Sequence, residues 1–151
     1  MRIVKIIMLV LLVCFVGLQF VPTKLNQSTV VPKTDFMEVN KVPATIRNKL
    51  QVSCYDCHSN NTDYPWYNKI QPAAWFLEDH IKQGKDELNF SEWEAYSNRR
   101  KNSKLRSIIS QIEDDEMPLY SYTLLHREAK ISEAEKISII HYLTALRDSL
   151  E

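Results

Sequence analysis

Glycine is almost absent from this chain, since only Gly17 and Gly84 occur among its 151 residues. Phosphate-cradling loops such as G-x-G-x-x-G and the Walker A motif need several glycines close together. The chain also lacks an excess of either charge, with 19 basic and 19 acidic residues. Its one basic cluster, NRRKNSKLR (98–106), is typical of a solvated helix face. We therefore expect neither a nucleotide nor a nucleic acid as a partner.

Cysteine is scarce as well, yet two of the three cysteines stand beside a histidine in CYDCH, as Cys54, Cys57 and His58. Structural zinc needs four ligands, and the chain has no second C-x-x-C and no H-x₃₋₅-H. A thioredoxin-like dithiol would accompany a βαβ pattern, which is missing. A plain disulfide suits an oxidising compartment but leaves the adjacent histidine unexplained.

The pattern C-x-x-C-H is the attachment motif of c-type haem. On a helix, positions i, i+3 and i+4 share one face. Two thiols on that face can form thioethers to the haem vinyl groups while the imidazole binds the iron. We therefore predict one covalently attached haem c, held by Cys54 and Cys57, with His58 as the proximal iron ligand.

The N-terminal segment, residues 1–22, differs from the rest of the chain. Arg2 and Lys5 precede an apolar run that begins at Ile6, and Pro22 ends it. This pattern predicts a membrane anchor or a signal segment, and the lack of an A-x-A-like cleavage site favours an uncleaved anchor. The positive-inside rule then predicts a single-pass protein of the cell membrane, with its main domain facing the periplasm.

Two further regions follow. Residues 23–42 are polar and without periodicity, which predicts a linker. Residues 43–151 are predicted to form the c-type haem-binding domain, and because no segment reads as a strand we expect an all-α fold, a small cytochrome c-like helical domain around one haem.

Helix signals recur along this domain. Four patterns carry the prediction: a helix from Pro43 to Cys54, one from Pro72 that Gly84 is expected to end, an amphipathic stripe from Leu105 to Ile112, and a last helix over 131–150. Capping boxes are predicted at Ser91 with Glu94 and at Ser132 with Glu135.

The ligand on the other side of the iron separates electron transfer from ligand binding. Met117 lies in a loop that follows an amphipathic helix, and we expect it to be the distal iron ligand, although methionines often only fill gaps in a core. His80, on the apolar face of its helix, is the alternative distal ligand. His126, His141 and an open sixth position are less favoured.

Aromatic residues are concentrated after the CYDCH motif. Haem offers a large flat apolar surface, and a small domain gains stability by packing aromatic rings against it. We therefore expect these residues to form the pocket wall and the core: Tyr64, Trp66, Tyr67, Trp75, Phe76, Phe90, Trp93 and Tyr96.

The segment CYDCHSNNTDYPWYNKIQP, with HIKQGKDELNFSEW and DDEMPLYSYTLLHREAKIS further on, resembles the bacterial haem-binding domain family of small membrane-tethered c-type cytochromes. The resemblance covers residues 41–150. It implies one covalently attached haem in an all-helical cytochrome fold that faces the periplasm. Met117 and Pro118 look like the Met-Pro segment that supplies the second axial ligand in many bacterial cytochromes c.

The function predicted from these residues is single-electron transfer, by a membrane-tethered monohaem cytochrome, to redox partner proteins in the cell envelope. His58 and Met117 would occupy both axial positions, so that the iron changes oxidation state with little rearrangement. On this reading the chain is not an enzyme. The alternative is a peroxidase-like haem enzyme, or a gas or redox sensor, with an open or displaceable distal site.

Overall fold

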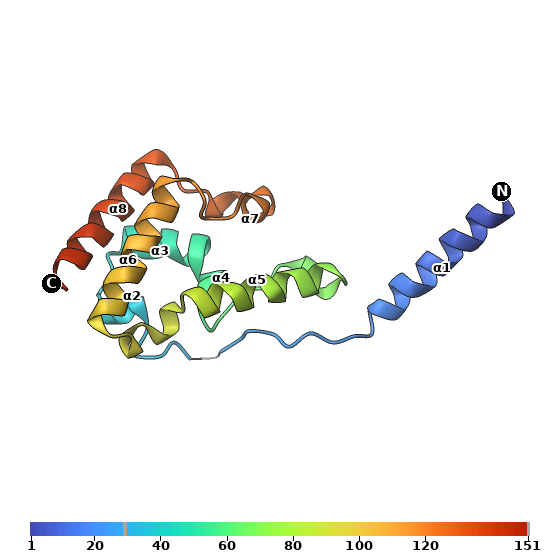
Figure 1. The fold of residues 1–151 in the computed structure, drawn as a ribbon, viewed down its shortest axis with the longest axis horizontal. Helices are drawn as coiled ribbons and strands as arrows, with labels where there is room; N and C mark the ends of the chain where they lie inside the picture. Colours follow the sequence, from blue (N-terminus) through green and yellow to red (C-terminus); the bar gives the residue numbers. More distant parts are fainter. Residues whose placement is uncertain (29, 151) are drawn as a thin grey trace.

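The computed structural model describes residues 1–28 and 30–150; Thr29 of the expected linker and Glu151 of the expected domain lie outside it. All regular structure in the described residues is helical, which confirms the predicted all-α class (Figure 1). The elements are α1 (Arg2–Leu18), α2 (Phe36–Val39), α3 (Ala44–Leu50), the π-helical η1 (Gln51–Tyr55), α4 (Asp56–His58), the 3₁₀ helix η2 (Trp66–Lys69), α5 (Ala73–Glu87), the 3₁₀ helix η3 (Phe90–Ala95), α6 (Asn98–Glu113), α7 (Tyr120–Leu125), the 3₁₀ helix η4 (Arg127–Ala129) and α8 (Glu133–Asp148).

Helices α6 and α8 lie side by side and form one end of the domain (Figure 1). Each begins at a serine whose hydroxyl accepts a backbone N–H bond: Ser97 accepts from Arg100, and Ser132 accepts from Glu135. The Glu135 side chain also accepts from the Ser132 backbone N–H, so the capping box predicted there is confirmed.

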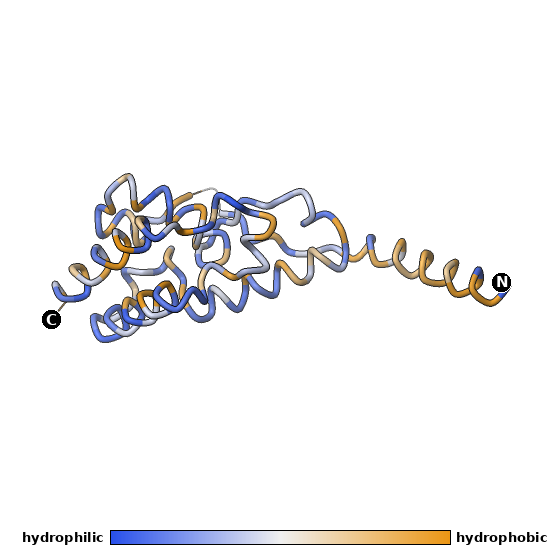
Figure 2. Tube along the Cα trace, turned by 90° about the horizontal axis from the view of Figure 1, so that it is seen from above, coloured by the Kyte–Doolittle hydropathy of each residue, from blue (hydrophilic) through white to orange (hydrophobic). Residues whose placement is uncertain are grey.

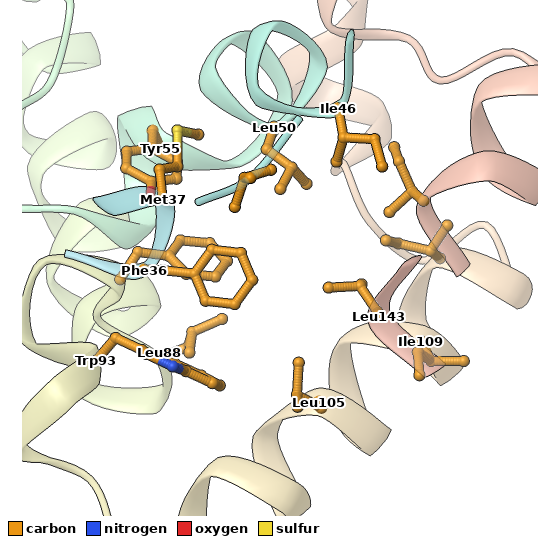
Figure 3. Packing of buried hydrophobic residues seen from close by; sticks show 14 of the residues in the cluster. Phe36, Met37, Ile46, Leu50, Tyr55, Leu88, Trp93, Leu105, Ile109 and Leu143 are labelled. Carbon is orange, nitrogen blue, oxygen red and sulfur yellow. The ribbon is translucent and has the colours of Figure 1, made fainter. Parts of the chain in front are cut away.

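The core lies between these two helices and α2, α3, η1 and η3, and its side chains point toward one another (Figure 3). Aromatic rings fill its centre. Phe36 meets Trp93 edge-on, with ring centroids 4.9 Å apart, and Tyr55 stacks on Phe90 at 5.0 Å. Leu105 and Leu143 close the side toward α6 and α8.

The segment expected to be a linker, 23–42, is bound to the domain at both ends. Phe36 is fully buried, and Met37 and Val42 lie beside it in the core. Nearer the N-terminus, the Asn26 side chain donates to the Ser59 carbonyl at 2.9 Å. This differs from the prediction because the apolar residues near position 36 are too few to give a periodic signal, yet they complete the core.

Helix α1 projects from the domain and is hydrophobic along nearly its whole length (Figure 2). It has 17 residues, and none of them is buried. Over the residues that the structure covers, no helix reaches the combination of length and apolar character required to cross a membrane.

Two local predictions are wrong. Helix α5 does not end at Gly84 but continues to Glu87, because Gly84 keeps ordinary negative φ and serves a close approach described below. No capping box forms at Ser91, since Asn89 caps η3 by accepting from the Ser91 backbone N–H. Ser91 is buried instead, and its hydroxyl accepts from the Asn60 backbone N–H at 3.0 Å.

Candidate haem site

The CYDCH motif lies at the end of a helix that changes its winding. Helix α3 runs directly into the π-helical η1, which contains Cys54, and then into the single α-helical turn α4, which contains Cys57 and His58. Leu50 and Tyr55, on the other side of this helix, are buried in the core. The motif is therefore fixed to the core from behind, and short π-helical segments are frequent at functional sites.

In front of the motif lies a cavity of about 530 Å³. The five residues predicted for the site, Cys54, Cys57, His58, His80 and Met117, all line it. Its remaining walls come from η1, α4, α5, η3, α6, α7 and neighbouring loops: Ser53, Asp56, Gln83, Gly84, Glu87, Leu88, Phe90, Lys104, Ser107, Ile108, Gln111, Ile112, Pro118, Leu119, Tyr122 and Ile131. The fold thus brings together predicted site residues up to 63 positions apart, from Cys54 to Met117.

The His58 ring is oriented by two backbone carbonyls. Its Nδ1 lies 2.9 Å from the Gly84 oxygen and 3.1 Å from the Leu88 oxygen. Both partners can only accept, so Nδ1 carries the hydrogen and Nε2 keeps a free lone pair. Burial lowers the pKa of His58, which favours the neutral imidazole. This is the form, and the kind of outer hydrogen bond, that a metal-binding histidine requires.

Gly84 lets helix α5 approach the motif closely. A Cβ at this position would lie 2.8 Å from the Cys57 carbonyl oxygen, a distance that real side chains do not tolerate. The same residue supplies the nearer of the two carbonyls that bind His58. Gly84 therefore serves the site twice, through its missing side chain and through its backbone.

The middle of the motif is anchored by Asp56. Its two carboxylate oxygens accept from the Tyr122 hydroxyl at 2.6 Å and from the Asp63 backbone N–H at 3.0 Å. Burial raises the pKa of Asp56, an effect that these two hydrogen bonds oppose. The contact with Tyr122 ties α7 to the motif, and Tyr122 itself lines the cavity.

Met117 reaches the cavity because the chain folds back at the end of α6. The Gln111 carbonyl accepts from the backbone N–H groups of both Glu116 and Met117, at 3.0 and 3.1 Å. Asp115 has φ of +56°, a left-handed conformation that commonly ends helices. Its carboxylate is bound by Lys136 of α8 at 2.6 Å. The turn that presents Met117 is thus held from two sides.

The three other histidines lie in different settings. His80 is exposed at the cavity, and its Nδ1 is 2.7 Å from the Phe76 carbonyl oxygen. His126 does not line the cavity; its Nε2 is 2.9 Å from the Tyr67 hydroxyl oxygen, and its ring stacks on Tyr122 at 4.3 Å. His141 is exposed on α8. Of these three, only His80 lines the cavity.

Both motif cysteines are free thiols that open onto the cavity. Burial raises the pKa of Cys54 to about 12 and that of Cys57 to about 11. Such values keep both groups protonated, whereas a redox-active dithiol depends on a lowered thiol pKa. Among the described residues, no group of three histidine, cysteine or acidic side chains is placed to hold a metal ion.

The contribution of α6 to the site was not predicted from the sequence. The cluster interpreted as a solvated helix face contains Lys104, which lines the cavity together with Ile108 and Gln111 on the same face of α6. Their spacing of four and three residues was the available signal, but two of the three are polar.

The aromatic residues only partly follow the prediction. Phe90 lines the cavity, and Trp93 and Tyr96 are buried in the core as expected. Trp66 and Phe76, in contrast, are 73% and 66% exposed, so the prediction that they form core or pocket wall is wrong.

A helical domain whose cavity combines two thiols, an oriented neutral imidazole and a thioether has the donors and the room that a haem needs. The site therefore defines a haem-binding protein. The chain belongs to the haem-binding domain family, whose pattern matches residues 13–145. This match confirms the family resemblance, and no solved structure matches the chain.

A curated relative bears on activity. Cytochrome c peroxidase Ccp of Escherichia coli (strain K12) is 27% identical over 142 residues, which cover 89% of this chain and 30% of the relative. The chain thus spans less than a third of the length of that protein. The similarity contradicts the prediction that the chain is not an enzyme, because it connects the chain with a named peroxidase.

Proposed function

We propose that this chain binds one haem c covalently and transfers single electrons in the bacterial cell envelope, as part of peroxide reduction. The observation that carries the proposal is the presence of Cys54, Cys57, His58 and Met117 on the walls of one cavity. Each cysteine adds across one haem vinyl group: the sulfur bonds to one vinyl carbon, and the thiol hydrogen goes to the other. When bound, the haem iron supplies a one-electron couple.

The side chains have distinct roles in this proposal. His58 binds the iron through Nε2, while the carbonyls of Gly84 and Leu88 hold the ring by Nδ1. Met117 would supply the second iron ligand, and a thioether in that role would raise the reduction potential relative to a second histidine. Lys104 lines the same cavity and pairs there with Glu87, its Nζ lying 3.8 Å from a Glu87 carboxylate oxygen.

The location in the envelope rests on the N-terminal segment. Arg2 and Lys5 lie in the first turns of α1, ahead of its apolar run, and such a charge pattern supports a cytoplasmic N-terminus with the remainder in the periplasm. A domain at this location would exchange electrons with redox proteins of the cell envelope. The similarity to the E. coli cytochrome c peroxidase supports a peroxide-reducing centre as the acceptor of these electrons.

A second function is favoured by His80. It is exposed at the cavity, and its Nδ1 hydrogen-bonds to a backbone carbonyl. This bond fixes the orientation of the ring and therefore of Nε2. Met117 lies on a loop and is only half-buried. If Met117 does not hold the iron, a bound haem would have room for peroxide, and His80 would hold or deliver a proton at Nε2.

The near-infrared spectrum of the oxidised holoprotein separates these functions. Electron transfer through a His–Met site predicts a methionine-to-iron charge-transfer band that disappears in Met117→Ala and persists in the matched variant His80→Ala. A band that survives in Met117→Ala contradicts the proposed ligand. Fast peroxide reduction by the unmutated holoprotein that falls in His80→Ala supports the second function instead.

A further inference from the structure

Four large apolar side chains are exposed within one short stretch of the domain. Trp66 of η2 and Phe76 of α5 are 73% and 66% exposed, and between them Ile70 and Trp75 are 39% and 37% exposed. We call these four residues the aromatic patch. They contribute nothing to the core cluster, and none of them lines the haem cavity.

The aromatic patch is fastened to the end of helix α1. Gln71, in the middle of the patch, is buried, and its backbone N–H donates to the Gln19 side-chain oxygen at 2.9 Å. The Gln19 amide donates back to the Gln71 carbonyl at 3.2 Å, and the Gln71 amide donates to the Val21 carbonyl at 3.2 Å. Figures 1 and 2 both show this end of the domain next to the base of α1. The segment that carries the patch is therefore joined directly to the end of the apolar helix.

The chemistry of this surface fits a lipid bilayer better than a protein partner. No charged residue occurs between Ile6 and Gln19, and every side chain of α1 is unburied. A helix that is apolar on all sides is suited to surroundings of lipid, whereas a protein partner would cover one stripe. Tryptophan combines an apolar body with a polar N–H and is enriched where the bilayer meets water.

We propose that the aromatic patch inserts into the interfacial layer of a lipid bilayer, so that the haem domain is held against the membrane in one orientation. The inference rests on the membrane location given under the proposed function. It adds that the domain does not move freely on a tether, because the contact between Gln19 and Gln71 couples patch and helix. The haem cavity then faces its partners from a fixed height above the membrane.

Lipid crosslinking of the full chain tests this proposal without depending on haem. The protein is reconstituted into phosphatidylcholine vesicles in which part of the lipid carries a photoreactive diazirine close to the headgroup, and labelled peptides are identified by mass spectrometry. We expect label in α1 and in residues 66–76. In Trp66→Ser with Phe76→Ser, the label in 66–76 should fall several-fold while α1 stays labelled.

Ile137→Ser is the matched control, because Ile137 is 69% exposed on α8, far from the aromatic patch in the sequence. This variant should leave the labelling unchanged. Label in α1 without label in 66–76 overturns the patch proposal and leaves the membrane location standing. Label in neither segment overturns both, while the absorption spectrum of the same sample still reports independently on haem and electron transfer.

Discussion

At the scale of single residues, the candidate site depends on a backbone feature as much as on its ligands. Gly84 brings α5 close enough for its carbonyl to bind His58 Nδ1 at 2.9 Å. A side chain here would collide with the Cys57 carbonyl, which is backbone and cannot rotate away. The His58 ring and the Cys57 backbone are thus both positioned by a residue with no side chain.

Gly84→Ala should displace α5 from the motif and weaken the hold on the His58 ring. We expect the yield of covalently loaded protein to fall and the free energy of unfolding to drop by about 1–3 kcal/mol, the usual cost of forcing an extra carbon into a packed site. Gly17→Ala is the control, because a Cβ at Gly17 has no atom within 4 Å. The effect is measured as haem yield per protein and by urea unfolding. Equal results for the two variants would contradict the role of Gly84 in positioning the site.

Single-residue chemistry was the part most accessible from sequence. Cys54, Cys57 and His58 form a motif whose spacing alone predicts a cofactor. Met117 lies beside a proline in a loop. The role of Gly84 was not predictable, since its neighbour Cys57 lies 27 positions earlier in the chain and only the tertiary structure brings the two together.

At the scale of elements, the N-terminus of α8 carries a pH-sensitive contribution to stability. The Ser132 side chain and backbone, followed by Lys49, lower the pKa of Glu135 from its ordinary value of 4.5 to about 2. A carboxylate with a lowered folded pKa stabilises the protein above its unfolded pKa, and this contribution is lost as the pH falls toward the folded value. Because the Glu135 side chain is 40% exposed, water and salt reduce the effect.

Glu135→Gln should therefore lower the free energy of unfolding at pH 7 by about 0.5–1 kcal/mol. The difference from the unmutated protein should shrink as the pH falls from about 4.5 toward about 2. Glu133→Gln, which removes a charge from the same turn but makes no cap, serves as the control. Urea titrations across this range measure both, and a difference that stays constant with pH would contradict the assigned cause.

Elements with strong local signals were predictable, and those shaped by distant contacts were not. Helix α8 begins at its predicted capping box. The π-helical η1 gave no signal, because the spacing of Ile46, Leu50 and Cys54 fits an ordinary α-helix equally well. Its geometry accompanies a contact that the sequence does not show, in which the Ser53 hydroxyl donates to the Ala129 carbonyl at 2.8 Å.

At the scale of the whole molecule, the N-terminal region and the haem domain are more tightly joined than the sequence suggested. Gln19 is a polar residue near the end of the apolar N-terminal segment, and Asn26 lies in the polar segment without periodicity that was expected to be a linker. Their partners, among them Gln71 and Ser59, lie 33 or more positions away, so no local pattern could reveal them. The domain boundary predicted at residue 43 therefore does not separate two independently placed parts.

The central claim is that Cys54 and Cys57 hold one haem covalently. Its most direct test is the intact mass of the full chain after unfolding and acid extraction, using protein from a host that attaches haem to c-type cytochromes. The account predicts a mass increased by one haem, and the mass of the bare chain for Cys54→Ser with Cys57→Ser. The bare-chain mass for the unmutated protein from the same host would contradict it.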